Sequence, residues 1–191
     1  MDFLNKEKKG VAITENLLAT QFGGHIYSLV DDTKDVENAS FGFVGKKIDG
    51  ERELSEFITP DAGNIDQFPA VLVATPPEIY YAPTREGYQE YYFVNEQEKP
   101  MRAFSLHLHD EFAITEYSID LINDTAGAQK GNYCVLQADS NRVKEVVTPT
   151  GTEGFVLEII DVDSSPLRPH IMINSKKQPK FIGLRVVKNQ I

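Results

Sequence analysis

Cysteine is nearly missing from the sequence, and this excludes two ways of stabilising a protein of this size. Cys134 is the one cysteine among 191 residues, so neither an intrachain disulfide nor a cluster of metal-binding thiolates can form. Its neighbours in residues 133–136 are apolar or aromatic, and nothing nearby in the sequence would lower its pKa. We therefore expect Cys134 to be a small buried side chain and not a nucleophile.

Long apolar runs are missing as well. No segment approaches the roughly 18 consecutive apolar residues that a membrane-spanning helix needs. Residues 1–9 lack the apolar stretch of a signal peptide. We therefore expect no membrane partner, and we expect the protein to be made in a cytoplasm.

Basic residues are scarce, with 19 Lys and Arg against 29 Asp and Glu, which gives a formal net charge of −10. Binding to phosphates requires a local excess of Lys and Arg, so nucleic acid is not an expected partner. The charge is uneven: residues 145–163 hold five acids and no base, and residues 164–191 hold six bases and no acid. Neighbouring antiparallel strands with cross-strand ion pairs explain this pattern. A basic edge that docks on an acidic partner is the alternative.

Aromatic residues are plentiful, with 11 Phe and 8 Tyr, and the hydrophobic pattern favours strands nearly everywhere. Turn-forming residues separate these strands at a spacing of about 8–12 residues, which is typical of a sandwich or barrel. We expect a mainly β, antiparallel sandwich- or barrel-like body with long surface loops and little helix. The expected strands cover residues 25–30, 40–45, 70–75, 90–94, 102–108, 111–115, 132–137, 142–147, 154–162, 169–173 and 180–187, and short helical stretches are expected at 84–92 and 115–121.

The chain divides into three stretches. Residues 1–22 are polar with scattered apolar residues, and we expect an extended N-terminal arm that is ordered by a partner. Residues 23–100 form a β-rich first half, in which the acidic stretch 31–66 is expected to make long surface loops around one strand. Residues 101–191 form an antiparallel barrel or sandwich half. Pro100 is the expected boundary, with one continuous domain over residues 23–191 as the alternative.

The sharpest local pattern for chemistry is His107-Leu108-His109. On a strand, a His-x-His pair would place both imidazoles on one face, which is how metal sites of the cupin type begin. The positions that would supply the next ligand hold Ala113 and Ile114, and no further histidine follows in the expected turn and strand up to Ile160. We expect a polar strand end and no metal, with a His107 and His109 site as the alternative.

Other signatures of catalysis are missing: there is no nucleophile elbow, no catalytic Cys–His pattern and no phosphate-binding glycine loop. Tyrosine is instead concentrated in one strip, at Tyr80, Tyr81, Tyr88, Tyr91 and Tyr92. Such a strip suits a half-buried strand pair or a contact surface for protein or carbohydrate. We therefore expect no enzymatic activity and no cofactor.

An ordered series of segments carries a resemblance to a known family. The segments are residues 25–27, Val71 to Tyr81 (Val-Leu-Val-Ala-Thr-Pro-Pro-Glu-x-x-Tyr), 92–96, 102–106, 110–115 and 131–133. Over about residues 24–160 the chain resembles the capsid decoration proteins of tailed bacteriophages, also called cement or auxiliary head proteins.

The resemblance implies a structural protein of the virion that binds the outer surface of the capsid and stabilises the lattice of the major capsid protein. It also implies self-association, typically as a homotrimer, after assembly in the bacterial host cytoplasm. We expect the contacts with the capsid to come from the arm (Phe3, Leu4, Lys6, Lys8 and Lys9) and from the Tyr strip (Tyr80, Tyr81 and Tyr91). A cupin-like enzyme or sensor and a component of the phage tail or baseplate are the alternative functions.

Overall fold

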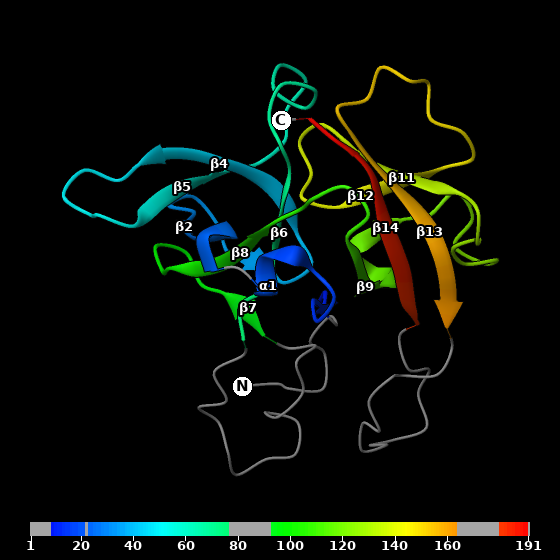
Figure 1. The fold of residues 1–191 in the computed structure, drawn as a ribbon, viewed down its shortest axis with the longest axis horizontal. Coiled ribbons are helices and arrows are strands. Elements are labelled where there is room, and N and C mark those ends of the chain that lie inside the picture. The colour runs from blue at the N-terminus through cyan, green and yellow to red at the C-terminus, as the bar shows by residue number, and fades with distance from the viewer. Residues whose placement is uncertain (1–8, 22, 77–92, 164–179, 191) are drawn as a thin grey trace, which may run out of the picture.

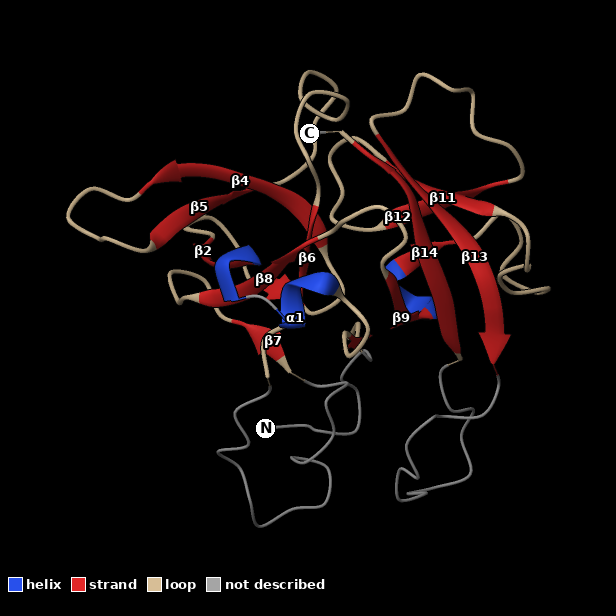
Figure 2. Ribbon diagram, viewed as in Figure 1, coloured by secondary structure: helices blue, strands red, loops and turns tan. Residues whose placement is uncertain are grey.

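The computed structural model describes residues 9–21, 23–76, 93–163 and 180–190, and in these ranges the protein is mainly β (Figures 1 and 2). The strands form a closed five-stranded barrel and a seven-stranded sheet that lies beside it. This confirms the mainly β, barrel-like body that the sequence predicts. No helix within the described ranges is long and apolar enough to cross a membrane. The helices described are α1 (Leu18–Gln21) and the 3-10 helices η2 (Gly23–His25) and η5 (Glu116–Ser118).

The barrel has the strand order β2-β5-β4-β6-β8, in which β2 runs parallel to β5 and the other pairs are antiparallel. A cluster of buried apolar side chains packs along these strands, among them Leu29, Phe57 and Val73. The five strands are β2 (Ile26–Val30), β4 (Phe41–Lys47), β5 (Leu54–Ile58), β6 (Val71–Val73) and β8 (Met101–Ser105).

The seven-stranded sheet has the order β1-β9-β14-β13-β11-β12-β10 and is antiparallel except between β10 and β12. Its strands are β1 (Ala12–Ile13), β9 (Glu111–Thr115), β10 (Ile119–Asp120), β11 (Tyr133–Leu136), β12 (Val143–Val146), β13 (Phe155–Asp163) and β14 (Phe181–Asn189). A separate two-stranded ribbon joins β3 (Val36–Glu37) to β7 (Val94–Asn95).

One apolar core joins the barrel to the sheet. The ring of Phe41, on barrel strand β4, lies 6.3 Å from the ring of Phe112 and 5.8 Å from that of Phe155, both on the sheet. All three rings are buried, and the cluster around them includes residues from both bodies. Since burial of large aromatic side chains is the main stabilising term in such a contact, the two bodies depend on each other for stability.

The stretch that the sequence assigned to long acidic loops, residues 31–66, contains an additional barrel strand. This strand, β5, pairs with both β2 and β4. Its inward positions include the small polar residue Ser55, which is as buried as its neighbour Phe57. A buried serine interrupts the alternation of apolar and polar residues by which strands are recognised.

Residues 9–21 pack on the body of the protein, although the sequence places them in an extended arm ordered by a partner. Val11, Leu17 and Ala19 are buried, and β1 pairs with β9. The sequence around residues 9–21 does not show this packing, because the partner strand β9 lies about a hundred residues further along the chain. The expectation of an arm now concerns residues 1–8 alone, which lie outside the described residues.

The chain passes from the barrel to the sheet between β8 and β9, whereas the sequence places the boundary at Pro100. β8 follows Pro100 directly but belongs to the barrel, because it pairs with both β2 and β6. The strand expected at residues 169–173, most of the one expected at 90–94 and the helix expected at 84–92 lie outside the described residues.

The opposite charges of residues 145–163 and 164–191 do correspond in part to neighbouring antiparallel strands, as predicted. β13 pairs with β14, and Glu158 stands opposite Arg185. The guanidinium of Arg185 lies 3.7 Å from Glu158 and 2.8 Å from Glu111 on the next strand, β9. Arg185 therefore links three strands on the outer face of the sheet.

Candidate interaction surface

The described residues that border residues 1–8 and 77–92 lie next to each other in space. Lys9 Nζ donates a hydrogen bond to Glu37 Oε1 at 3.0 Å. Glu37, on β3, stands directly opposite Val94 on β7. Asn38 follows Glu37 and binds Thr75, the residue before Pro76. The two stretches that carry the expected capsid contacts therefore join the body at one place.

The border of residues 164–179 lies at the same end of the molecule. Phe181, at the start of β14, stands opposite Thr115 on β9. Thr115 in turn donates its backbone N–H to Val11 O at 3.0 Å, two residues after Lys9. We call the surface around Lys9, Glu37, Thr75, Val94 and Phe181 the junction end; it lies on the lower side of the body in Figure 1, around β7 and the start of β14.

Gly10 makes the close approach at the junction end possible. A Cβ atom at this position would lie 2.3 Å from Asn38 O and 2.3 Å from Ser118 Oγ, so that no side chain fits. Asn38 belongs to the barrel side and Ser118 to η5 on the sheet side. The backbone of Gly10 thus passes between the two bodies, and glycine is required because of space and not because of an unusual backbone angle.

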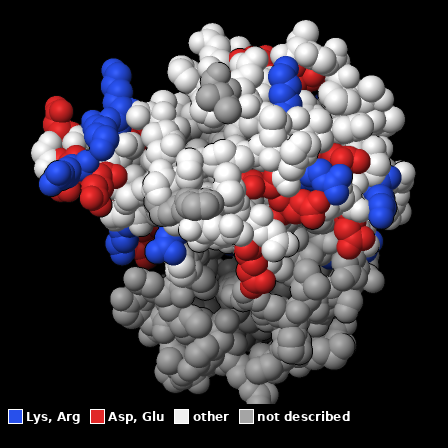
Figure 3. All heavy atoms as spheres, viewed as in Figure 1, with Lys and Arg blue, Asp and Glu red and all other residues white. Residues whose placement is uncertain are grey.

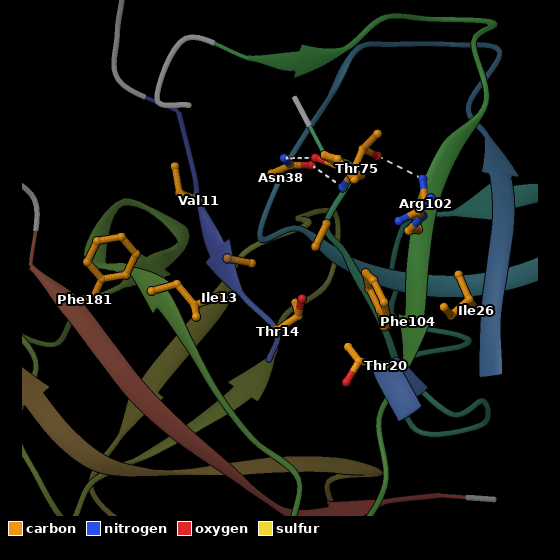
Figure 4. A pocket seen from close by; sticks show the side chains of 13 residues that line it. Val11, Ile13, Thr14, Thr20, Ile26, Asn38, Thr75, Arg102, Phe104 and Phe181 are labelled. Atoms are coloured by element: carbon orange, nitrogen blue, oxygen red, sulfur yellow. Dashed lines mark hydrogen bonds between the residues drawn. The ribbon is translucent and has the colours of Figure 1, made fainter. Parts of the chain in front are cut away.

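A pocket of about 400 Å³ lies at the junction end, between β1 and the barrel (Figure 4). Figure 4 shows β1 between β9 and the barrel strand that carries Arg102 and Phe104. The lining is partly apolar and partly polar. The lining residues come from several separate stretches of the chain: Val11, Ala12, Ile13, Thr14, Thr20, Ile26, Asn38, Ala74, Thr75, Pro76, Arg102, Phe104 and Phe181.

A network of hydrogen bonds holds one wall of the pocket. Asn38 donates from Nδ2 to Thr75 O at 2.8 Å and accepts at Oδ1 from Thr75 N at 3.0 Å. Asn95 adds bonds from its Nδ2 to Val36 O and to Asn38 Oδ1. Thr75 Oγ1 accepts from the backbone N–H of Arg102 at 2.9 Å. These side chains fix the backbone of the wall while the guanidinium of Arg102 remains exposed.

Of the contact residues expected from the sequence, Lys9 lies at the junction end and is half-buried against Glu37. The others, Phe3, Leu4, Lys6, Lys8, Tyr80, Tyr81 and Tyr91, lie outside the described residues. The sequence carries no signal for the pocket itself, because its lining is assembled from segments that are far apart in the chain. Asn38 lines the pocket and binds backbone groups of its wall, but a lone asparagine in the sequence does not predict this role.

His107 and His109 do not form the pair on one strand face that the metal alternative needs. β8 ends at Ser105, and residues 106–110 form a turn in which His109 has a φ of 70° and is exposed. The change of backbone direction in this turn removes the alternation that would align the two imidazoles. Among the described residues, no group of three or more His, Cys, Asp or Glu side chains could hold a metal ion.

The ring of His107 packs instead against that of His25, with a centroid distance of 4.7 Å and an angle of 87°. Its Nδ1 lies 3.6 Å from Asp110 Oδ2 and makes no hydrogen bond. The buried carboxylate of Asp110 accepts the backbone N–H groups of Leu18, at 3.0 Å, and of His107, at 2.8 Å. Asp110 therefore ties α1 to the turn between β8 and β9, which is a structural role.

Cys134 is buried, as the sequence predicts. Burial, and to a smaller extent the negative charge of Glu145, raises the pKa of its thiol well above the usual range. Glu145 is itself buried and accepts hydrogen bonds from Ile122 N, Gln129 N and Asn132 Nδ2. The Cys134 thiol therefore remains protonated and unsuited to nucleophilic attack.

Charged side chains gather on two parts of the face drawn in Figure 3. One group lies over the hairpin between β4 and β5, and the other lies over β13 and β14, where Arg185 pairs with Glu111 and Glu158. The area between them carries few charges.

No family model, no curated protein and no solved structure matches this chain.

Proposed function

We propose that this chain is a non-enzymatic structural protein of a bacteriophage virion, which binds the outer surface of the capsid at its junction end and stabilises the lattice of the major capsid protein. The proposal combines the resemblance over residues 24–160 with the arrangement of the described residues. The observation that carries it is that Glu37 neighbours both Lys9, which follows residues 1–8, and Val94, which lies two residues after the stretch 77–92.

Contact residues act together only if they reach the same partner surface. Residues 1–8 and 77–92 are separated along the chain by nearly seventy residues, yet their borders meet at β3 and β7. The border of the basic stretch 164–179 lies at the same end, through Phe181, Thr115 and Val11. The described residues beside all three stretches therefore lie at one end of the protein, which is the end proposed to contact the capsid.

The body suits a protein that clamps neighbouring subunits. The shared core around Phe41, Phe112 and Phe155 couples the barrel to the sheet, so that force applied at one body is passed to the other. Many copies that bind only the expanded lattice would stabilise it by their binding free energy. A net charge of −10 would keep a densely repeated surface protein soluble.

The test uses capsids assembled from the major capsid protein encoded in the same genome, prepared in the unexpanded and the expanded form. We expect the full-length protein to co-sediment with expanded capsids to saturation and to bind unexpanded capsids weakly. Deletion of residues 1–8 removes Phe3, Leu4, Lys6 and Lys8 but leaves β1 and Gly10 in place. We expect this variant to keep its thermal midpoint and to lose most of its capsid binding.

Lys46→Ala with Lys47→Ala is the matched control, because it removes positive charge from the end of β4, in the exposed hairpin away from the junction end. The control should bind as the unaltered protein does. Equal saturation by the deletion variant would show that the N-terminal residues have no role in the contact. Failure of the unaltered protein to bind either form of capsid would refute the proposed function itself.

A further inference from the structure

We propose that the free edge of β1 binds an extended peptide segment of a partner protein, which adds to the seven-stranded sheet and presents an acidic side chain to Arg102. Such a site goes beyond the capsid proposal, because it does not depend on the partner being a capsid protein. It rests on the backbone register of β1, on the pocket beside it and on the charge of Arg102.

Among the described residues β1 is an edge strand, with β9 as its one neighbour in the sheet. Thr115 N donates to Val11 O, and Ala12 stands opposite Ile114. In an antiparallel ladder, hydrogen-bonded and non-hydrogen-bonded pairs alternate, so Ala12 belongs to a non-hydrogen-bonded pair. Its N–H and C=O therefore point away from β9, toward the side on which the pocket lies.

The same alternation directs the N–H of Thr14 to this side, and no described residue accepts a hydrogen bond from it. Ala12 and Thr14 both line the pocket. Backbone donors and acceptors that repeat every second residue match the backbone of another extended strand. An edge whose backbone groups are not paired with another strand is a template for strand addition.

The pocket supplies the remaining features of a peptide site. Its volume of about 400 Å³ is sufficient for a short stretch of side chains. Ile26 and the accessible edges of the otherwise buried Phe104 and Phe181 provide apolar contacts for side chains of a bound strand. The opposite wall is held by the Asn38 and Thr75 hydrogen bonds, so the site needs little rearrangement on binding.

Arg102 determines the charge of the expected peptide. Its side chain is exposed at the pocket, and within the described part of the chain its guanidinium pairs with no carboxylate. In contrast, Arg142 lies 3.9 Å from Asp120 and Arg185 pairs with Glu111 and Glu158. A carboxylate side chain from the peptide would give Arg102 the charge-assisted, bidentate partner that arginine favours.

Ala12→Pro is the variant that tests the edge. Proline removes the outward N–H of Ala12, whereas the ladder bonds to β9 are made by the backbone groups of Val11 and Ile13 and remain. Proline is tolerated on edge strands when the lost N–H does not face the neighbouring strand. Ile13→Pro is the contrasting variant, because it removes a ladder N–H and should lower the thermal midpoint.

The probe is a random library of linear heptapeptides, selected on the full-length protein. The enriched peptides are then synthesised with blocked termini, so that carboxylates come from side chains alone. We expect an enriched acidic consensus, and amide shifts of Ala12 and Thr14 in ¹⁵N spectra on its addition. Ala12→Pro and Arg102→Gln should each weaken binding by about tenfold, which corresponds to the loss of roughly one hydrogen bond or ion pair.

Arg142→Gln is the matched control for charge, and it should leave the Kd unchanged. Three results would overturn the proposal: no enriched peptide, binding that is unaffected by both Ala12→Pro and Arg102→Gln, or a consensus without acidic residues. If Ala12→Pro lowers the thermal midpoint, its weaker binding could come from unfolding. The amide shifts of Ala12 and Thr14 in the unaltered protein and the Kd of Arg102→Gln then test the site in its place. The measurement uses no capsid, so its failure would leave the capsid proposal untouched.

Discussion

Asn189, near the end of β14, and Ala70, just before β6, form a reciprocal pair of hydrogen bonds between the sheet and the barrel. Asn189 Oδ1 accepts from Ala70 N at 2.8 Å, and Asn189 Nδ2 donates to Ala70 O at 3.1 Å. The same amide nitrogen donates to Leu106 O at 2.8 Å, at the point where the chain leaves the barrel. All of these groups are buried, so one side chain satisfies three backbone groups at the contact between the two bodies.

Asn189→Ala should therefore destabilise the whole protein. It leaves Ala70 N, Ala70 O and Leu106 O buried without partners, and we expect a loss of about 3 kcal/mol in the free energy of unfolding. Urea unfolding measures this loss. Asp124→Ala, at an exposed position in a loop, is the control and should change the stability by less than about 0.5 kcal/mol. A loss of similar size in both variants would contradict the role of Asn189.

Gly10→Ala should also destabilise the protein, because its Cβ would overlap Asn38 O and Ser118 Oγ, each 2.3 Å away. We expect a loss of about 2 kcal/mol, as is usual when a packed site must accept an extra methyl group. Gly24→Ala is the matched control, since a Cβ there meets no atom within 4 Å. Equal thermal midpoints for the two variants would show that residues 9–14 do not pack between the two bodies in solution.

The thiol of Cys134 should resist alkylation in the folded protein. Its side chain is fully buried, and its pKa is raised by burial and by Glu145, so the thiolate is both rare and inaccessible. We expect labelling by iodoacetamide at pH 8 to be slow in buffer and complete within minutes in guanidinium chloride. The free energy of opening calculated from the slow rate should follow the stability changes of the other variants. Rapid labelling of the native protein would contradict the buried position.

The carboxylate of Glu153 should make a small contribution to stability that depends on pH. Hydrogen bonds from the Thr150 backbone, then from the Thr150 hydroxyl and Gly151 N, lower the pKa of Glu153 to about 2. In the unfolded chain the pKa of Glu153 is near its usual value of about 4.3. Between this pH and the folded-state pKa, the unfolded chain therefore binds more protons than the folded protein does. The contribution is therefore complete above about pH 5 and is lost as the pH falls toward 2.

Comparison with Glu153→Gln isolates this contribution, because the amide keeps the shape of the side chain but not its charge. Urea unfolding at pH 7 should show the variant to be less stable than the unaltered protein, and the difference should shrink as the pH is lowered to 2. The difference is expected to be modest, since the side chain lies in an exposed turn and solvent screens its charge. A difference that is constant with pH would mean that the turn does not depend on the carboxylate.

Most strands could be predicted from the sequence because their own residues carry the pattern. The run at residues 70–75 is short, apolar and bounded by prolines, and it forms β6 in the barrel. The change from acidic to basic charge predicted the pairing of β13 with β14, and the ion pair of Glu158 with Arg185 follows from that register. In both cases the pattern that predicts the structure, apolar residues or charge, lies within one stretch of sequence or in two adjacent stretches.

The remaining features depend on contacts between distant segments, which a single sequence does not reveal. β1 is two residues long and is recognised as a strand only by its pairing with β9. β5 is missed because the buried Ser55 breaks its pattern of apolar and polar residues. The junction end brings Lys9, Glu37 and Val94 together from three parts of the chain. The pocket likewise exists only after the barrel and the sheet have packed on each other.

Imaging of the virus particle tests the proposed function most directly. Cryo-electron microscopy of particles from a host that carries the unaltered protein is compared with particles that lack it or that carry the deletion of residues 1–8. We predict extra density at regular positions on the outer surface of the capsid, in contact with the major capsid protein through the junction end and reduced in both comparison samples. Density at the tail, or no difference on the head, would contradict the proposal that the protein decorates a capsid.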